Sequence, residues 1–397
     1  MEIEQTKEVK EIWYKKGKIS LPVMRIPLEK LIYNKYNGRI KSIVKSFESG
    51  LGRKLDPENT EDAKIIQTFL FDSAAYRNEK TIQSLKDYGQ QEVGIVTKDM
   101  VIIDGNRRAS LLKKMFSSGH KVNYFKAIIL PDEMKQEPLE IIKLETNYQM
   151  GVDNKVEYNP IEKYLRCDEL VNEHKISIEE VAKLMAEKTT RINQWLSILQ
   201  LMNEYLEYLK SPHVYTRINK NEGHFVDLHN YLNKYYAQNK NKCSELKQTY
   251  FDYIRLGLPV SRIRVIGNPN NNLSLFANDG LWNEFFEKHQ KTIAEYKEPD
   301  FIELKKANPY KSNEDVYTNL DYRFRSELES ELKSNLVSGE ISIKKIIEKK
   351  SRLDKLIEVE KMIKDLNFSH LDNIEKTNII SALNRISQLI NKLTLSI

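Results

Sequence analysis

Hydrophobic and polar positions follow two different periods along the chain, and the change of period divides it into parts. Apolar runs that favour strands occupy residues 24–31, 93–97, 100–103 and 124–130. Apolar residues at helical spacing occupy residues 40–47, 65–85, 108–116 and 139–148. The polar pair Lys98-Asp99 separates two strand-like runs and predicts a hairpin. We therefore expect a small α+β domain over residues 1–155, with a tail or a first hairpin up to about residue 21 and a polar loop at residues 54–62.

The pattern is almost purely helical beyond a polar break at residues 151–158. Asn159 and Pro160 have the residue types of a helix N-cap and first helical position. Ser177 and Glu180 have the spacing of a capping box, which predicts a second helix start. We expect a helical region over residues 156–270 and, after an asparagine-rich loop at 268–272, a helical C-terminal domain over residues 271–397.

The C-terminal residues carry a regular apolar stripe with spacings of four and three. It consists of Ile379, Leu383, Ile386, Ile390, Leu393 and Ile397. An amphipathic helix precedes it, with Leu353, Leu356, Met362, Ile363 and Leu366. Such a stripe is typical of an a/d seam, so we expect a helical hairpin bent at residues 368–372, or a coiled coil that forms a homodimer.

Composition narrows the class of protein only slightly. The chain has 397 residues, a net charge of +6 and a pI of about 8.8, which is compatible with a phosphate-rich partner. The two cysteines, Cys167 and Cys243, form no CxxC pair, so we expect neither a zinc site nor a disulfide framework. The charged residues 1–18 do not resemble a signal peptide, and no apolar run is long enough for a membrane span. We expect a cytoplasmic, nucleoid-associated protein.

The strongest candidate for chemistry lies at residues 101–109, where a strand runs into a glycine and a helix follows directly. Gly105 lets the backbone approach a ligand, and the helix N-terminus after it favours an anion. Arg107 and Arg108 add planar donors that match phosphate oxygens. Asp104 is a candidate to hold a metal ion or polarise a water. The alternative is an ordinary Asp-Gly turn with solvated arginines.

Several segments resemble the ParB/sulfiredoxin superfamily, in that family's order. Residues 105–111, GNRRASL, resemble its Gly-Glu-Arg-Arg box, and residues 24–39 resemble its opening strand and loop. Residues 145–149, ETNYQ, resemble its second phosphate box, Glu-Asn-x-Gln-Arg. Residues 158–163 resemble its Leu-x-Pro-Ile-Glu helix start, after which a helix-turn-helix follows.

This resemblance implies a nucleoside triphosphate, CTP or ATP, bound with Mg²⁺, and nucleotide-dependent closure of a clamp on DNA. The residues that would bind nucleotide are Gly105, Asn106, Arg107, Arg108 and Arg39. The residues that would contact phosphate, metal or water are Asp104, Asn147 and Gln149, with Asn147 as the metal ligand. The sequence departs from the family at Met150, where arginine is usual, and at Asn106, where ParB proteins have glutamate. Both departures bear on nucleotide identity and on hydrolysis.

The helix-turn-helix is expected over residues 177–200. Its second helix, from Thr189 to Leu199, leaves a polar N-terminal half consisting of Thr189, Thr190, Arg191, Asn193 and Gln194. Arginine, asparagine and glutamine are residue types that read base edges in the major groove. The turn lacks the common glycine, and Glu187 stands in its place. A plain helical hairpin is the alternative, and Trp195 is expected in the core.

Three functions follow from these patterns. The first is a ParB-like protein that binds a site on double-stranded DNA as a dimer and is switched by nucleotide. The second is an enzyme of the ParB/sulfiredoxin fold, an NTPase, kinase or nuclease, in a bacterial phage-defence or mobile-element system. The third is a helical scaffold that recruits a partner protein through residues 272–397. None of the three involves a membrane.

Overall fold

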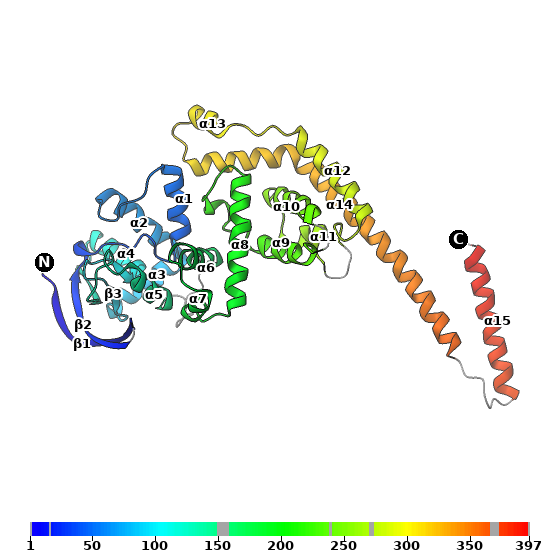
Figure 1. Cartoon of the computed structure of the whole chain (residues 1–397), viewed down its shortest axis with the longest axis horizontal. Coiled ribbons are helices and arrows are strands. Elements are labelled where there is room, and N and C mark those ends of the chain that lie inside the picture. Colours follow the sequence, from blue (N-terminus) through cyan, green and yellow to red (C-terminus); the bar gives the residue numbers. More distant parts are fainter. Residues whose placement is uncertain are drawn as a thin grey trace. The chain divides into compact units, whose positions relative to one another are not determined.

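The computed structural model describes residues 2–15, 17–148, 159–237, 240–269, 274–365 and 373–395 (Figure 1). The chain forms two compact units, Met1–Leu336 and Val337–Ile397. The first unit begins with a mixed sheet and continues with helices, which agrees with the predicted α+β domain and helical region. No helix in the described ranges is long and apolar enough to span a bilayer.

The sheet has five strands in the order β1-β2-β5-β3-β4. They are β1 (Glu4–Tyr14), β2 (Gly17–Pro27), β3 (Gly94–Val96), β4 (Ile102–Asp104) and β5 (Tyr124–Ile129). All neighbouring pairs are antiparallel except β3 and β5, which are parallel. The predicted hairpin of β3 and β4 is confirmed, and the first residues form a hairpin of β1 and β2 rather than a tail.

Helices cover both faces of the sheet. They are η1 (Leu28–Lys30), α1 (Lys41–Leu51), α2 (Thr60–Asp72), α3 (Ala75–Tyr88), α4 (Asn106–Ser117) and α5 (Pro138–Thr146). Ile102 packs in the cluster formed with α1, α2 and α4, whereas the next residue, Ile103, packs in the cluster formed with α5. Successive strand residues point to opposite faces, so the short strand β4 serves both cores.

The expectation of one helix over residues 65–85 is wrong, because α2 ends at Asp72 and α3 begins at Ala75. Ala74 leaves the helical region with φ −151° and ψ 52°. The side chain of Asn78 donates to the carbonyl of Phe71 at 2.8 Å, where a continuous helix would use a backbone N–H. Apolar spacing does not detect this break, since both helices keep their buried residues in phase. The same helix also starts earlier than expected, at Thr60, with Asn59 as its N-cap.

The rest of the first unit is helical. It contains α6 (Pro160–Asp168), η3 (Glu169–Glu173), α7 (Ile178–Leu184), α8 (Thr189–Tyr208), η4 (Tyr215–Ile218), α9 (Glu222–Tyr235), α10 (Lys240–Arg255), α11 (Val260–Gly267), α12 (Asp279–Glu295), α13 (Phe301–Ala307) and the first part of α14 (Asn313–Lys364). The two predicted helix starts are confirmed, since Asn159 accepts from the amide of Ile161 and Ser177 from that of Glu180.

The second unit contains the end of α14 and α15 (Asn373–Leu395). The predicted C-terminal helix is present, and α15 has no buried residue along its described length. Ile390 and Leu393 of the predicted stripe are more than half exposed. The predicted bend at residues 368–372 and the last stripe residue, Ile397, lie outside the described residues.

Candidate functional site

The candidate site begins where β4 ends and α4 starts. Gly105 is the N-cap of α4 and has φ 98°, a left-handed conformation that disfavours other residues. A Cβ atom at this position would lie 2.7 Å from Cζ of Phe125 on β5. The junction therefore requires glycine for its backbone angle and for its contact with the sheet. The free amides at the start of α4 form a favourable place for an anion.

Four arginines surround this helix start. Arg107 donates from Nε to Asn78 Oδ1 at 3.2 Å and from Nη2 to Thr81 Oγ1 at 3.2 Å, so α3 holds its guanidinium in place. Burial lowers the pKa of Arg107, and the charges of Arg39 and Arg77 lower it further. Arg39 and Arg77 thus each lie within electrostatic reach of Arg107 and repel its charge. An anion between them would relieve that repulsion.

Arg108 lies on the side of the helix start that faces β3. Its Nη1 donates to the carbonyl of Glu92 at 2.8 Å. Burial lowers the pKa of Arg108, while Asp104 and Glu92 oppose this and Arg39 adds to it. Arg39 therefore acts on both arginines of the predicted box. The structure brings together all three predicted arginines, and it adds Arg77, which the sequence analysis did not select.

Asp104, the predicted metal or water residue, has two further neighbours. Lys10 of β1 donates from Nζ to the carbonyl of Val93 at 2.8 Å. Burial lowers the pKa of Lys10, and the charge of Asp104 is the largest influence that opposes it. Burial also raises the pKa of Tyr148, with a smaller contribution from Asp104. Lys10 Nζ lies 5.8 Å from the centre of the Tyr148 ring.

Sequence analysis did not select Lys10, because it lies 94 positions before Asp104. The hairpin of β1 and β2 carries it to this edge, and no local motif signals that approach. Asn147 follows α5 as its C-cap and is partly exposed. Gln149, the other residue predicted to contact phosphate or metal, lies outside the described residues, as does Met150. The roles of Asn147 and Gln149 stay predictions.

Asn106 is buried and both ends of its amide contact backbone. Its Oδ1 accepts from the amide of Asn34 at 3.0 Å, and its Nδ2 donates to the carbonyl of Ile102 at 2.8 Å. This side chain therefore joins the loop after η1 to the first residue of β4. At this position, where the ParB proteins that the sequence resembles have glutamate, the Asn106 side chain hydrogen-bonds only to backbone groups among the residues that the structure describes. Its predicted contact with nucleotide would therefore have to come from its backbone amide.

A buried network connects the same loop to the helical region. Arg166 of α6 donates to Glu145 Oε2 at 3.0 Å, to Glu169 Oε2 at 2.7 Å and to the carbonyl of Tyr36 at 3.1 Å. Asn37 Nδ2 donates to the other oxygen of Glu145 at 3.2 Å. Burial raises the pKa of Glu145, and Arg166 opposes this. A single arginine thus joins α5, α6, η3 and the loop that carries Arg39.

The start of α1 has a second connection to α6. Ser42 donates from Oγ to Glu162 Oε1 at 2.5 Å and from its amide to the same atom at 3.0 Å. Lys41 Nζ lies 2.8 Å from Glu169 Oε2, and burial lowers the pKa of Lys41 to about 8. Burial raises the pKa of Glu162 to about 7, although the bonds from Ser42 oppose it. Glu162 belongs to the predicted helix-start motif, but its partner could not be read from the sequence.

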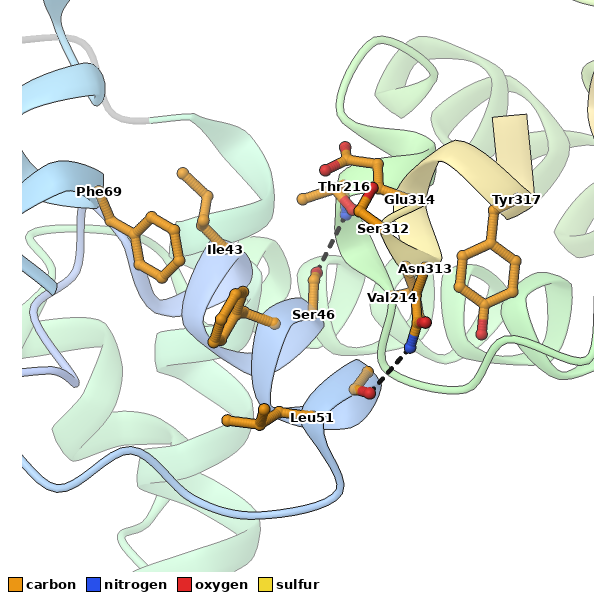
Figure 2. Close-up of a pocket in the computed structure, with 12 residues that line it drawn as sticks. Ile43, Ser46, Leu51, Phe69, Val214, Thr216, Ser312, Asn313, Glu314 and Tyr317 are labelled. Carbon is orange, nitrogen blue, oxygen red and sulfur yellow. Dashed lines mark hydrogen bonds between the residues drawn. The ribbon is translucent and has the colours of Figure 1, made fainter. Parts of the chain in front are cut away.

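The other end of α1 contacts the helical region. Ser46 Oγ accepts from the amide of Thr216 at 3.1 Å, and Asn313 Nδ2 donates to the carbonyl of Gly50 at 2.8 Å (Figure 2). Between these contacts lies a mostly apolar cavity of about 460 Å³. Its apolar walls come from Ile43, Phe47, Leu51, Phe69, Val214 and Tyr317. The helix after Arg39 is therefore held by the helical region at both of its ends.

The residues predicted to contact DNA lie at the start of α8. Thr189, Thr190, Arg191 and Asn193 are exposed, and Gln194 is half-buried. Arg191 Nη1 donates to Gln194 Oε1 at 3.0 Å. The link between α7 and α8 uses a left-handed residue without glycine, namely Ala186 with φ 53°.

Beneath this helix pair, the predicted core residue Trp195 packs against α6. Trp195 is buried, as predicted, with its ring 5.8 Å from that of Tyr164 on α6. Because Trp195 and the exposed Arg191 are on the same helix, α8 is anchored to α6 and still presents its polar start to solvent. That α7 and α8 act as a DNA-binding helix-turn-helix stays a prediction.

Comparison with known proteins identifies no family. No family model matches the chain, and no curated protein sequence matches it. Among solved structures, the chain is similar to C-terminally truncated ParB from Caulobacter crescentus, a chromosome-partitioning protein. In its complex with CTP-gamma-S the identity is 14%, the TM-score is 0.20, and the match covers 52% of this chain and 92% of that one. In its complex with the centromeric parS site the identity is 13% and the TM-score 0.32, and the match covers 61% of this chain and 97% of that one.

A third similar structure is a Pnob8-like ParB-N domain. The identity is 17% and the TM-score 0.26, with 72% of this chain and 99% of that chain covered.

Proposed function

We propose that this chain is a double-stranded-DNA-binding protein whose contact with DNA is switched by a bound nucleoside triphosphate, CTP or ATP. The observation that carries the proposal is the gathering of Arg39, Arg77, Arg107 and Arg108 around the glycine at the start of α4. A triphosphate offers several negative charges at one place, which suits a group of neighbouring arginine cations. A single carboxylate would match such a cluster less well.

The parts of the site have separate roles in this proposal. The amides after Gly105 and the guanidinium groups of Arg107, Arg108 and Arg39 bind phosphate oxygens. Asn147 and Gln149, which follow α5, hold Mg²⁺ or a phosphate-bound water. Asn106 keeps the loop after η1 in register with β4, and its backbone amide is available at the helix start.

The route from nucleotide to DNA runs through the loop that carries Arg39. That loop and α1 are fastened to α6 by Arg166 and Glu162, and α6 packs against α8. A phosphate that draws Arg39 toward Arg107 would therefore act on the helix that supports the start of α8. Thr189, Thr190, Arg191, Asn193 and Gln194 would contact the duplex there.

The second compact unit supplies the proposed dimer contact. In a single chain Ile390 and Leu393 of the α15 stripe are exposed, and the other described stripe residues, Ile379, Leu383 and Ile386, are only partly buried. A second copy can bury the stripe as an a/d seam. A different protein with an amphipathic helix is the other partner that this stripe would suit.

Asp104 supports a second candidate function, slow hydrolysis of the bound nucleotide. Its carboxylate acts on both Arg108 and Lys10, so it lies beside the proposed phosphate site. Such a carboxylate can orient a water for attack on phosphorus, or could hold a metal ion that would assist that attack. A DNA-binding switch that resets itself, an NTPase and a nuclease share this requirement.

The experiment is a thermal-shift panel of CTP, ATP, GTP and ADP with Mg²⁺, each with and without duplex DNA. A specific nucleotide should stabilise the fold by mass action, and Arg107→Ala should abolish the shift. Lys114→Ala, an exposed change on the same helix, should keep it. The proposal fails if no nucleotide shifts the wild-type protein, or if Arg107→Ala shifts as much as wild type.

The switch itself is tested by DNA binding in the presence and absence of the nucleotide that the panel selects. Ser42→Ala removes the hydroxyl bond from the start of α1 to Glu162 of α6, keeps the bond from the backbone amide, and leaves every arginine in place. It should keep nucleotide binding and reduce the effect of nucleotide on DNA affinity. An unchanged nucleotide effect in Ser42→Ala would exclude this route, and phosphate release lost in Asp104→Asn would support hydrolysis.

A further inference from the structure

A cavity of about 510 Å³ lies on the flank of α4, away from the glycine at its start. Its walls come from the segment around η1, from the start of α2 and from one residue of α4, Lys113. Leu31, Pro57 and Ala63 provide apolar surface, and Thr60 and Gln67 provide polar groups. A mixed lining of this size is typical of sites for small molecules.

Lys113 is the unusual member of this lining. It is partly buried, its Nζ donates to the carbonyl of Leu31 at 3.1 Å, and it lies 4.5 Å from the centre of the Tyr33 ring. No carboxylate of the described residues forms an ion pair with it. Burial alone lowers the pKa of Lys113 to about 8. The carbonyl and the ring use part of the ammonium group's hydrogen-bonding capacity and leave its charge uncompensated.

Two carboxylates, Glu29 and Glu58, line this cavity, and neither forms an ion pair with Lys113. Glu58 pairs with Lys135 at 3.2 Å, and Lys64 pairs with Glu61 at 2.8 Å. Lys30 also lines the cavity and adds a third cation to Lys64 and Lys113. A partly buried ammonium without a counter-ion is costly, since desolvation is not repaid by a partner.

We propose that this cavity binds a small aliphatic carboxylate, with its carboxylate paired to Lys113 and its carbon chain against Leu31, Pro57 and Ala63. A ligand carboxylate supplies the counter-ion that the chain lacks at Lys113. The apolar wall favours a carbon chain over a bare inorganic anion. A second carboxylate on the same ligand would reach the cations Lys30 and Lys64 at the rim.

This site is separate from the proposed nucleotide site. Lys113 lies six residues after Arg107 on α4, and none of the four clustered arginines lines the cavity. The two sites share α4 and the loop that runs from Leu31 to Arg39. The inference does not depend on the proposed function, because neither a nucleotide nor DNA takes part in it.

The test is competitive labelling of the intact protein with a trace of acetic anhydride at pH 7.5, read at each lysine by mass spectrometry. A group with a pKa of about 8 is roughly a quarter unprotonated there, against about one in a thousand for an ordinary lysine. Lys113 should therefore label faster than its exposed neighbour Lys114. Glutarate at constant ionic strength should slow labelling of Lys113 about tenfold or more and leave Lys114 unchanged.

Controls separate binding from general salt effects. Glutaramide, the uncharged analogue, and potassium chloride should leave the labelling of Lys113 unchanged. Stabilisation by glutarate should be lost in Lys113→Met and retained in Lys114→Met and in Arg107→Ala. Equal protection by glutarate and chloride overturns the proposal, as does unchanged stabilisation in Lys113→Met. The labelling of wild-type protein decides the matter even if Lys113→Met does not fold.

Discussion

The ring of Phe125 packs against the backbone of Gly105, so closely that a Cβ atom on the glycine would lie 2.7 Å from Cζ of the ring. The same ring closes on Gly94, where a Cβ atom would lie 2.4 Å away. One aromatic residue of β5 thus sets the approach of two backbone segments beside the arginine cluster. The start of α4 packs against Phe125 of the sheet, and no side chain in the described part of the chain caps it.

Gly105→Ala should therefore destabilise the protein more than its backbone angle alone would. A left-handed alanine costs about 1–2 kcal/mol, and overpacking against Phe125 adds about 1–3 kcal/mol. Gly119→Ala at the other end of α4 is the matched control, because its φ is 89° and no atom lies within 4 Å of the new Cβ. Urea unfolding should give the larger loss for Gly105→Ala; equal losses would contradict the role of Phe125.

Asn78→Ala should weaken nucleotide binding although Asn78 itself belongs to α3. The change removes the bond that holds Nε of Arg107, so the guanidinium loses part of its preorganisation. A hydrogen bond of about 0.5–1.5 kcal/mol corresponds to an affinity loss of roughly 2- to 10-fold. Titration with the nucleotide selected by thermal shift measures this, and the exposed Glu79→Ala should bind as wild type does.

Glu162 predicts a pH dependence of stability with a definite sign. Its folded pKa of about 7 lies above the ordinary value of 4.5, so the fold favours the protonated acid. The stability from this group is complete below pH 4.5 and is lost as pH rises through 7. The shift corresponds to at most about 3 kcal/mol. Wild-type protein should lose stability from pH 5 to pH 8.

Glu162→Gln tests this assignment, since glutamine is uncharged at every pH and can still accept from Ser42. The difference in unfolding free energy between variant and wild type should grow in the variant's favour from pH 5 to pH 8. Exposed Glu61→Gln should keep the slope of wild type. A Glu162→Gln protein with the wild-type slope would assign the pH dependence to another buried acid, such as Glu145.

Arg191→Ala should relax sequence discrimination on duplex DNA, because an exposed arginine at the start of α8 is suited to read guanine. The expected cost at one base pair is about 1–3 kcal/mol. Lys188→Ala, next to the helix start, should instead weaken all duplexes alike and lower the salt slope by about 1. Fluorescence anisotropy on a selected and a scrambled duplex separates the two effects. Unchanged discrimination in Arg191→Ala would favour the plain helical hairpin.

Leu383→Asp should disrupt self-association if the stripe of α15 is a dimer seam. A charge at an a/d position removes apolar contact and places two like charges together. Ser381→Asp on the exposed side of the same helix is the control. Sedimentation equilibrium should give a dimer for wild type and Ser381→Asp, and a shift toward monomer for Leu383→Asp. A monomeric wild-type protein would contradict the dimer seam and favour a partner protein as the ligand of this stripe.

Local sequence signals predicted several elements correctly. The hairpin of β3 and β4 follows from two apolar runs around Lys98-Asp99, and the helix starts at Asn159 and Ser177 follow from side chains that cap amides two or three residues away. Gly105, Arg107 and Arg108 were also selected from a local pattern, a glycine at a helix start followed by two arginines. These interactions span a few residues, so the sequence around each position contains nearly all the information that they require.

Only the tertiary structure decided the rest. Lys10 and Arg77 approach the site from β1 and α3, and Arg166 joins Glu145 to the loop at Tyr36 across long stretches of chain. The break between α2 and α3 depends on Asn78, which also holds Arg107. Such contacts arise from how whole elements pack, and their partners are set by topology rather than by spacing. For this protein the sequence determined where an anion site could begin, and packing determined which charges surround it.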